Sequence, residues 1–158
     1  MTDSQKNFMR QAIQLAKDGM LSGAGGPFGC VIVKDGKIVG QGSNRVLTTQ
    51  DPTAHAEVVA IRDACKNLNH FQLEGCELYA SCEPCPMCLG AIYWARPDRV
   101  FFACTKEDAA AIGFDDELIY REIEIKPSKR KIPMENLLRE ESLEAFELWK
   151  EKGDKALY

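Results

Sequence analysis

Residues 84–88 read Pro-Cys-Pro-Met-Cys, and residues 55–57 read His-Ala-Glu. Together the two segments offer one imidazole, two thiols and one carboxylate. Three nitrogen and sulfur ligands with a fourth position left open are typical of catalytic zinc sites, and a neighbouring carboxylate outside the ligand set can carry protons. We therefore predict that His55, Cys85 and Cys88 bind one zinc ion per chain, with Glu57 as the catalytic proton carrier.

The local sequence indicates how these side chains are held. Cys85 and Cys88 lie three residues apart after a proline, so both sulfurs are expected on one face of a first helical turn, where the positive helix end favours thiolates. Residues 51–53 form a turn and cap signal ahead of apolar residues at helical spacing, so His55 is expected to open a second helix. Glu57 lies only two residues after His55, too close for the side chains of both residues to reach the metal from one face.

Other interpretations of the cysteines stay open. A lone Cys-x-x-Cys can be a redox pair or two packed thiols. Cys82 could complete a four-ligand structural zinc site with His55, Cys85 and Cys88. Because Cys82 ends an apparent strand before the turn, we expect it near the metal but unligated. The remaining cysteines fall in apolar runs and are expected to be buried small hydrophobes: Cys30, Cys65, Cys76 and Cys104.

Composition narrows the possible partners and location. The 158 residues are 45% hydrophobic, which suits one globular domain, and the net charge is −4. The longest basic run is Lys129-Arg130-Lys131, so no nucleic-acid partner is expected. The amino-terminal residues lack an apolar signal core and no stretch has membrane-spanning length, so no membrane partner is expected either. Seven cysteines, two of them committed to metal, favour a reducing cytoplasm.

The order of the expected elements indicates the fold class. Hydrophobic periodicity and turn signals predict three helices and four strands up to residue 103. The helices cover 8–20, a segment opened by His55, and 85–94, and the strands cover 28–33, 38–43, 77–81 and 99–103. A hairpin followed by strand–helix repeats predicts an α/β fold with a mixed sheet and helices on both faces. Near the end, Leu143, Phe146 and Trp149 predict a further helix within 142–158, which Gly153 can terminate.

Four stretches carry a resemblance to a known family: GGPFGCVIVKDG (25–36), DPTAHAEVVAIRDAC (51–65), SCEPCPMCLGAIYWARP (81–97) and GFDDELIY (113–120). The chain resembles the cytidine deaminase-like zinc-dependent superfamily, whose members share the His-x-Glu and Pro-Cys-x-x-Cys segments. The resemblance implies a three-layer α/β/α sandwich with about five strands, formed as one domain over residues 1–158. The GFDD segment and the terminal Tyr158 are similar to members that convert guanine to xanthine and ammonia in purine salvage, so a small purine is the implied substrate.

The same resemblance implies the substrate contacts: Phe28, Asn44, Ala54, Trp94, Asp116 and Tyr158. The purine would stack near Phe28 and over the ring of His55, and would hydrogen-bond to Asn44 and to the backbone of Ala54. Trp94 and Asp116 would line the pocket wall. Tyr158 would come from the partner of a domain-swapped homodimer that exchanges residues 142–158.

Each substrate contact has a structural alternative. Asn44 could be a turn residue, Phe28 and Trp94 could be core aromatics, and Asp116 could cap a helix over 117–121. Asp115 is an equal chemical candidate beside Asp116. Tyr158 could belong to a frayed tail.

Alternatives to the function also remain. The substrate could be another amino-heterocycle, namely guanosine, cytosine or an aminotriazine. A different class would be a deaminase of tRNA adenosine, and a third would be a structural zinc module without catalysis.

Overall fold

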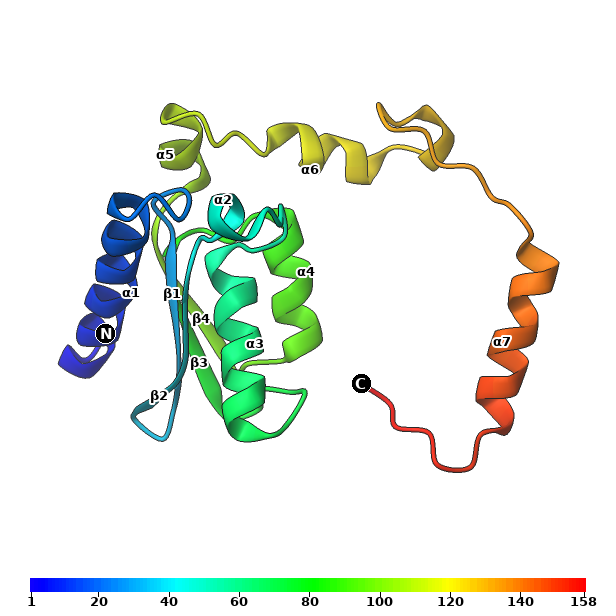
Figure 1. Cartoon of the computed structure of the whole chain (residues 1–158), viewed down its shortest axis with the longest axis horizontal. Coiled ribbons are helices and arrows are strands. Elements are labelled where there is room, and N and C mark those ends of the chain that lie inside the picture. The colour runs from blue at the N-terminus through cyan, green and yellow to red at the C-terminus, as the bar shows by residue number, and fades with distance from the viewer. The chain divides into compact units, whose positions relative to one another are not determined.

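A four-stranded mixed sheet organises the first part of the chain (Figure 1). In the computed structural model, which describes residues 1–158, the strands lie in the order β2-β1-β3-β4. Their bounds are Gly29–Lys34 (β1), Lys37–Ser43 (β2), Cys76–Cys82 (β3) and Arg99–Cys104 (β4). β1 pairs antiparallel with β2 and β3, and β4 runs parallel to β3. The predicted α/β class is confirmed, with four strands in place of about five because only helices follow β4.

Helix α1 (Asp3–Leu21) covers one face of this sheet. It begins with a capping box in which Thr2 and Gln5 exchange hydrogen bonds, so two backbone N–H groups of the first turn are satisfied. Ala12 on α1 is fully buried. It packs with the strand residues that point to this face: Val31, Val33 and Tyr79.

Helices α3 (Ala56–Leu68) and α4 (Pro86–Ala95) cover the opposite face. The strand residues on this side alternate with those under α1, as the two-residue period of a strand requires. They are Cys30, Ile32, Leu78 and Ala80, which form a core with small residues of the two helices. The helices on both faces of the sheet confirm the predicted three layers.

The approach of α3 to the sheet is unusually close. A Cβ atom added to Gly42 of β2 would lie 2.6 Å from the carbonyl oxygen of Ala56 and 2.7 Å from the nitrogen of Ala60. One at Gly40 would meet Cβ of Ala64 at 2.5 Å. Glycines on the strand and alanines on the helix therefore let the two backbones touch, which fixes the position of the first turn of α3.

Two short helices of this region were not predicted. α2 (Val46–Thr49) has only four residues, too few for hydrophobic periodicity to reveal. α5 (Lys106–Ala111) follows β4 and begins with a capping box between Thr105 and Asp108. That Thr-x-x-Asp spacing was visible in the sequence and was the available signal for α5.

Contacts divide the chain into two compact units, Met1–Asp116 and Glu117–Tyr158. The second unit contains α6 (Glu117–Glu124), a 3₁₀ helix η1 (Pro127–Lys129) and α7 (Arg139–Glu151). The helix predicted within 142–158 is present but begins earlier, at Arg139. None of the helices in the chain combines the length and the apolar character needed to cross a membrane.

Candidate active site

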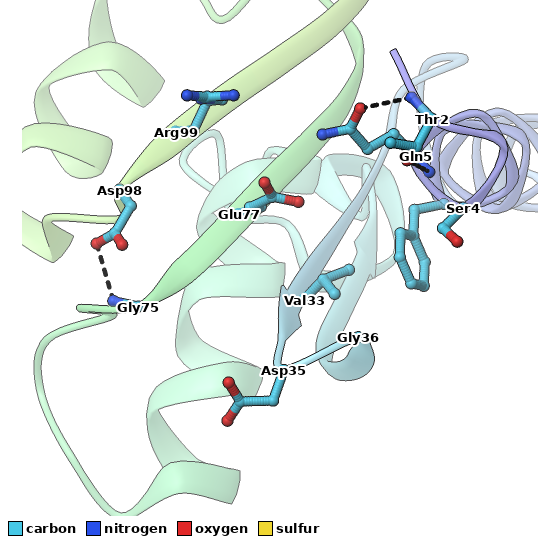
Figure 2. Close-up of a pocket in the computed structure, with 11 residues that line it drawn as sticks. Thr2, Ser4, Gln5, Val33, Asp35, Gly36, Gly75, Glu77, Asp98 and Arg99 are labelled. Carbon is cyan, nitrogen blue, oxygen red and sulfur yellow. Dashed lines mark hydrogen bonds between the residues drawn. The ribbon is translucent and has the colours of Figure 1, made fainter.

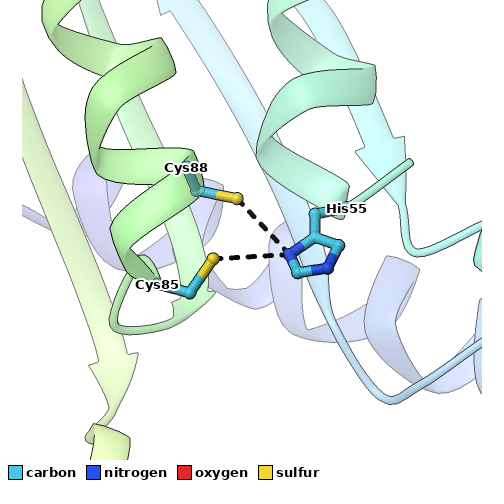
Figure 3. Close-up of side chains that lie close together, drawn as sticks. All are labelled: His55, Cys85 and Cys88. Carbon is cyan, nitrogen blue, oxygen red and sulfur yellow. Dashed lines mark hydrogen bonds between the residues drawn. The ribbon is translucent and has the colours of Figure 1, made fainter. Parts of the chain in front are cut away.

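The amino ends of α3 and α4 hold the predicted metal ligands. His55 is the N-cap residue of α3, and Cys85 is the N-cap residue of α4, with Cys88 in its first turn. Pro86 occupies the first helical position, where a missing N–H costs no hydrogen bond. Figure 3 shows the imidazole and the two thiols pointing toward one another from the two helices. Their ligand atoms all lie within 4.8 Å of one another.

A buried carboxylate borders this group. The Sγ atoms of Cys85 and Cys88 each lie 3.5 Å from Nδ1 of His55. The thiol of Cys88 also donates a hydrogen bond of 3.4 Å to Oε2 of Glu57. Glu57 is only 7% exposed and is not part of the metal-ligand group. The carboxylate is thus placed beside the ligands and is shielded from bulk water.

The ionisation of the two thiols fits a site built for a cation. Hydrogen bonds from Cys88 and His55 lower the pKa of Cys85 to about 4. Interaction with Cys85 and burial raise the pKa of Cys88 above its usual range, since a second thiolate would lie beside the first. A bound divalent cation removes this repulsion, because metals bind the thiolate form. One imidazole and two thiolates suit zinc and leave its fourth tetrahedral position open.

The environment of Glu57 suits proton transfer. Burial raises the pKa of this carboxyl above its usual range. A general acid or base works best when its pKa lies near the working pH, and burial moves a carboxyl in that direction. Glu57 can therefore accept a proton and release it again within the same reaction.

The third cysteine of the segment lies outside the ligand group. The thiol of Cys82, at the end of β3, donates to the carbonyl of Thr105 at 3.5 Å. The side chain is thus directed toward the start of α5, and no fourth protein ligand joins His55, Cys85 and Cys88.

Asn44 and Ala54 lie in the turns that flank α2. Asn44 is 5% exposed, and its Oδ1 accepts a hydrogen bond of 3.2 Å from the backbone N–H of Val46. The N–H of Asn44 donates to the carbonyl of Phe28 at 3.0 Å, which ties the two residues together. In the backbone of Ala54, the N–H donates to Asp51 and the carbonyl accepts from Arg45. Asn44 thus has a structural role, and the substrate contacts of both residues stay predictions.

The two predicted aromatic contacts differ in burial. Phe28 is partly buried and packs against the core formed beneath α3 and α4. Trp94 is six residues after Cys88 on α4, and its side chain is 64% exposed, so it is not a core aromatic. Trp94 therefore lies on the surface of α4.

The two neighbouring aspartates differ in burial. Partial burial raises the pKa of Asp116, and the negative charge of Cys85 raises it further, so the two groups lie within electrostatic range. Asp115 is exposed. This difference favours Asp116 over Asp115 as the substrate contact.

The last predicted contact, Tyr158, belongs to the second unit and is 68% exposed. Its place in the site of a partner chain therefore stays a prediction.

One aromatic residue that contacts the predicted stacking residue Phe28 was not predicted. Phe114 lies with its ring centroid 4.9 Å from that of Phe28, with the ring planes at 90°. Its position in the GFDD segment was the available signal, but a single aromatic residue after a glycine in a loop does not reveal its partner.

A hollow of about 510 Å³ elsewhere in the first unit contains no metal-ligand group (Figure 2). Two of its acidic lining residues have structural partners. Asp98 accepts a hydrogen bond of 2.8 Å from the N–H of Gly75, and Glu77 accepts one of 2.5 Å from the hydroxyl of Tyr79. None of its lining residues belongs to the metal-ligand group.

Comparison with known families agrees with the geometry. A model of the cytidine and deoxycytidylate deaminase zinc-binding region matches residues 2–104. This stretch contains all three predicted metal ligands and Glu57.

Two relatives match different extents of the chain. Guanine deaminase of Bacillus subtilis strain 168 is 53% identical over 155 residues, which cover 98% of this chain and 99% of that protein. The tRNA-specific adenosine deaminase of Aquifex aeolicus is 45% identical over 96 residues, which cover 61% of this chain and 63% of that protein. The X-ray structure of guanine deaminase from Bacillus subtilis matches with a TM-score of 0.95 and 52% identity, and covers 100% of this chain and 99% of that one.

The first prediction concerns the metal. We expect one zinc ion per chain. The variants Cys85→Ser, Cys88→Ser and His55→Ala should each fail to bind it. The Cys82→Ser variant should retain zinc, because the Cys82 thiol is directed toward Thr105. Metal content by mass spectrometry, with circular dichroism as a check on folding, tests this. Loss of zinc from the Cys82 variant would indicate a closed four-ligand site and would contradict the open coordination position.

Proposed function

Because the chain belongs to the family defined by the cytidine and deoxycytidylate deaminase zinc-binding region, we propose that it hydrolyses guanine to xanthine and ammonia with one bound zinc ion. The observation that carries this proposal is the similarity to the Bacillus subtilis guanine deaminase, which extends over 98% of the chain. It therefore includes both the metal-ligand group and the second unit. The similarity to the tRNA-specific adenosine deaminase covers 61% of the chain and cannot include both units in full.

Three side chains would hold the metal: His55, Cys85 and Cys88. When bound there, zinc would lower the pKa of a water molecule from about 15.7 toward roughly 7 and so supply a nucleophile at neutral pH. The thiolates are stabilised by the positive end of α4, and the N-cap position directs the imidazole of His55 toward them.

Glu57 moves the protons of the reaction. It takes a proton from the attacking water and delivers it to the ring nitrogen beside carbon 2 of guanine, while the water oxygen bonds to that carbon. It then takes the remaining proton of the added oxygen and passes it to the exocyclic amino group, so that the carbon–nitrogen bond breaks, the carbonyl at carbon 2 forms, and ammonia leaves. Its burial beside Cys88 keeps the proton from exchanging with bulk water during these transfers.

The remaining predicted residues orient the base. Phe28 and the ring of His55 provide stacking surfaces, and Asn44 and the backbone of Ala54 provide hydrogen bonds to the purine edge. Asp116 is suited to accept from an N–H group of guanine, since its carboxyl lies within electrostatic range of Cys85. Trp94 would limit the pocket on the side of α4.

The active form is proposed to be a homodimer that exchanges residues 142–158. Apolar side chains remain exposed in both units, including Tyr93 at 76% on α4 and Leu148 at 69% on α7. Exposed apolar surface of this kind marks interaction sites. From Gly153 to Tyr158 the chain reaches at most roughly 17 Å, enough to cross a subunit boundary and bring the phenol to the partner's pocket.

A cytoplasmic role in purine metabolism completes the proposal. None of the seven cysteines forms a disulfide bond, as a reducing compartment favours.

The second prediction tests the substrate. The zinc-loaded protein should release ammonia from free guanine with stoichiometric xanthine, whereas guanosine, cytosine, an aminotriazine and tRNA should give little. Ammonia release and chromatography of the product measure this. Turnover of cytosine or of tRNA adenosine in the absence of guanine turnover would assign the protein to another branch of its family.

The third prediction concerns Glu57. The Glu57→Gln variant should bind zinc and fold normally, because glutamine preserves the size of the side chain. Its turnover of guanine should fall by about 100- to 10,000-fold, the usual contribution of general acid–base catalysis. Turnover and zinc content are measured on the same preparation. Near-normal turnover with stoichiometric zinc would remove Glu57 from the mechanism.

The fourth prediction concerns the tail. Deleting residues 156–158 should leave folding and zinc content unchanged and should lower guanine turnover sharply. Mixing this truncated protein with the Cys85→Ser variant should restore part of the activity, because a mixed dimer has one site with both an intact metal and a tail. Sedimentation analysis reports the oligomeric state. Unchanged turnover after truncation would refute a role of the tail at the site, and a monomeric active protein would refute its delivery by a partner.

A further inference from the structure

Phe114 meets Phe28 in an edge-to-face contact. The ring centroids lie 4.9 Å apart and the ring planes are perpendicular, the preferred geometry of an aromatic pair. Phe28 is the residue on which the base is proposed to stack, so its neighbour determines which orientations that ring can adopt.

The loop before β1 packs tightly under both rings. A Cβ atom added to Gly26 would lie 2.8 Å from Cζ of Phe114 and 2.9 Å from Cε2 of Phe28. A side chain at position 26 would press on both rings, so at least one of them would have to shift. Phe28 is therefore confined by Gly26 on one side and by Phe114 on another.

Phe114 itself is anchored to the end of α5. Its backbone N–H donates to the carbonyl of Ala109 at 3.0 Å, and the N–H of Gly113 donates to Ala110 at 3.0 Å. Asp116 follows two residues later. One short segment thus holds an aromatic ring against Phe28 and a carboxyl within electrostatic range of Cys85.

We propose that Phe114 is a positioning residue for guanine deamination: it fixes the ring of Phe28 and thereby the plane in which the purine lies. This inference rests on the proposed function. The Phe114 side chain is 47% exposed, so its contribution to folding is small compared with that of a core aromatic. Its effect is expected in substrate binding, because stacking on Phe28 holds the base equally before and during the reaction.

The fifth prediction follows from this role. The Phe114→Ala variant should show a KM for guanine raised by about 2- to 12-fold, the equivalent of an aromatic pair, with kcat and zinc content retained. Gly26→Ala should raise KM as well, because the added methyl group displaces both rings. Phe71→Ala is the matched control: Phe71 is 52% exposed and stacks on His70, and its loss should leave KM unchanged.

A double variant separates this role from a general structural one. If Phe114 acts through Phe28, the Phe28→Ala/Phe114→Ala protein should have the KM of the Phe28→Ala protein alone, since the second substitution has nothing left to position. Additive effects, or an unchanged KM in Phe114→Ala, would overturn the inference. Phe114→Leu, which keeps an apolar side chain without the ring, replaces the alanine variant if that protein does not fold, with the same expected rise in KM. An inactive wild-type protein would overturn the proposed function and this inference together.

Discussion

The meeting of two helix amino ends at one point is the constraint on which the rest of the site depends. α3 presents His55 as its N-cap residue, and α4 presents Cys85 and Cys88 in its first turn. Both helix ends carry partial positive charge, which stabilises thiolates. The glycines of β2 allow α3 to touch the sheet backbone, so the imidazole is held at a fixed depth. A bulkier strand would push α3 outward and separate the imidazole from the thiols.

The metal-ligand group was predictable because it is indicated by residue types and spacings within two short segments of the sequence. The spacing of Cys85 and Cys88 implies one helical turn, and a cap signal ahead of His55 implies a helix start; both inferences need only a few residues. The strands of the hairpin were found for the same reason, since alternation and a turn signal are read from the sequence directly. The three-layer order followed from the succession of elements.

The rest of the site depends on contacts between residues distant in sequence, and these have no local signature. No sequence feature around Phe28 indicates that its ring contacts that of Phe114, because the two residues come from different loops. The sequence was compatible with Asn44 as a turn residue or as a substrate contact. In the structure its Oδ1 accepts from the N–H of Val46, which is a turn interaction, and the substrate contact stays a prediction. The fifth strand was expected from the family resemblance, whereas the residues after β4 form only helices.

The proposed function assigns chemistry and substrate orientation to different parts of this chain. The ligands and Glu57 lie at the starts of α3 and α4, whereas Phe28 and Phe114 lie on loops outside both helices. Loop residues can change without moving a helix end, because loops tolerate substitution better than packed elements do. A family that shares the metal-ligand group can therefore accept different amino-heterocycles by altering the loop before β1 and the segment after α5. The contact between Phe28 and Phe114 joins these two loops, so a substitution in one requires accommodation by the other if the base is to keep its orientation.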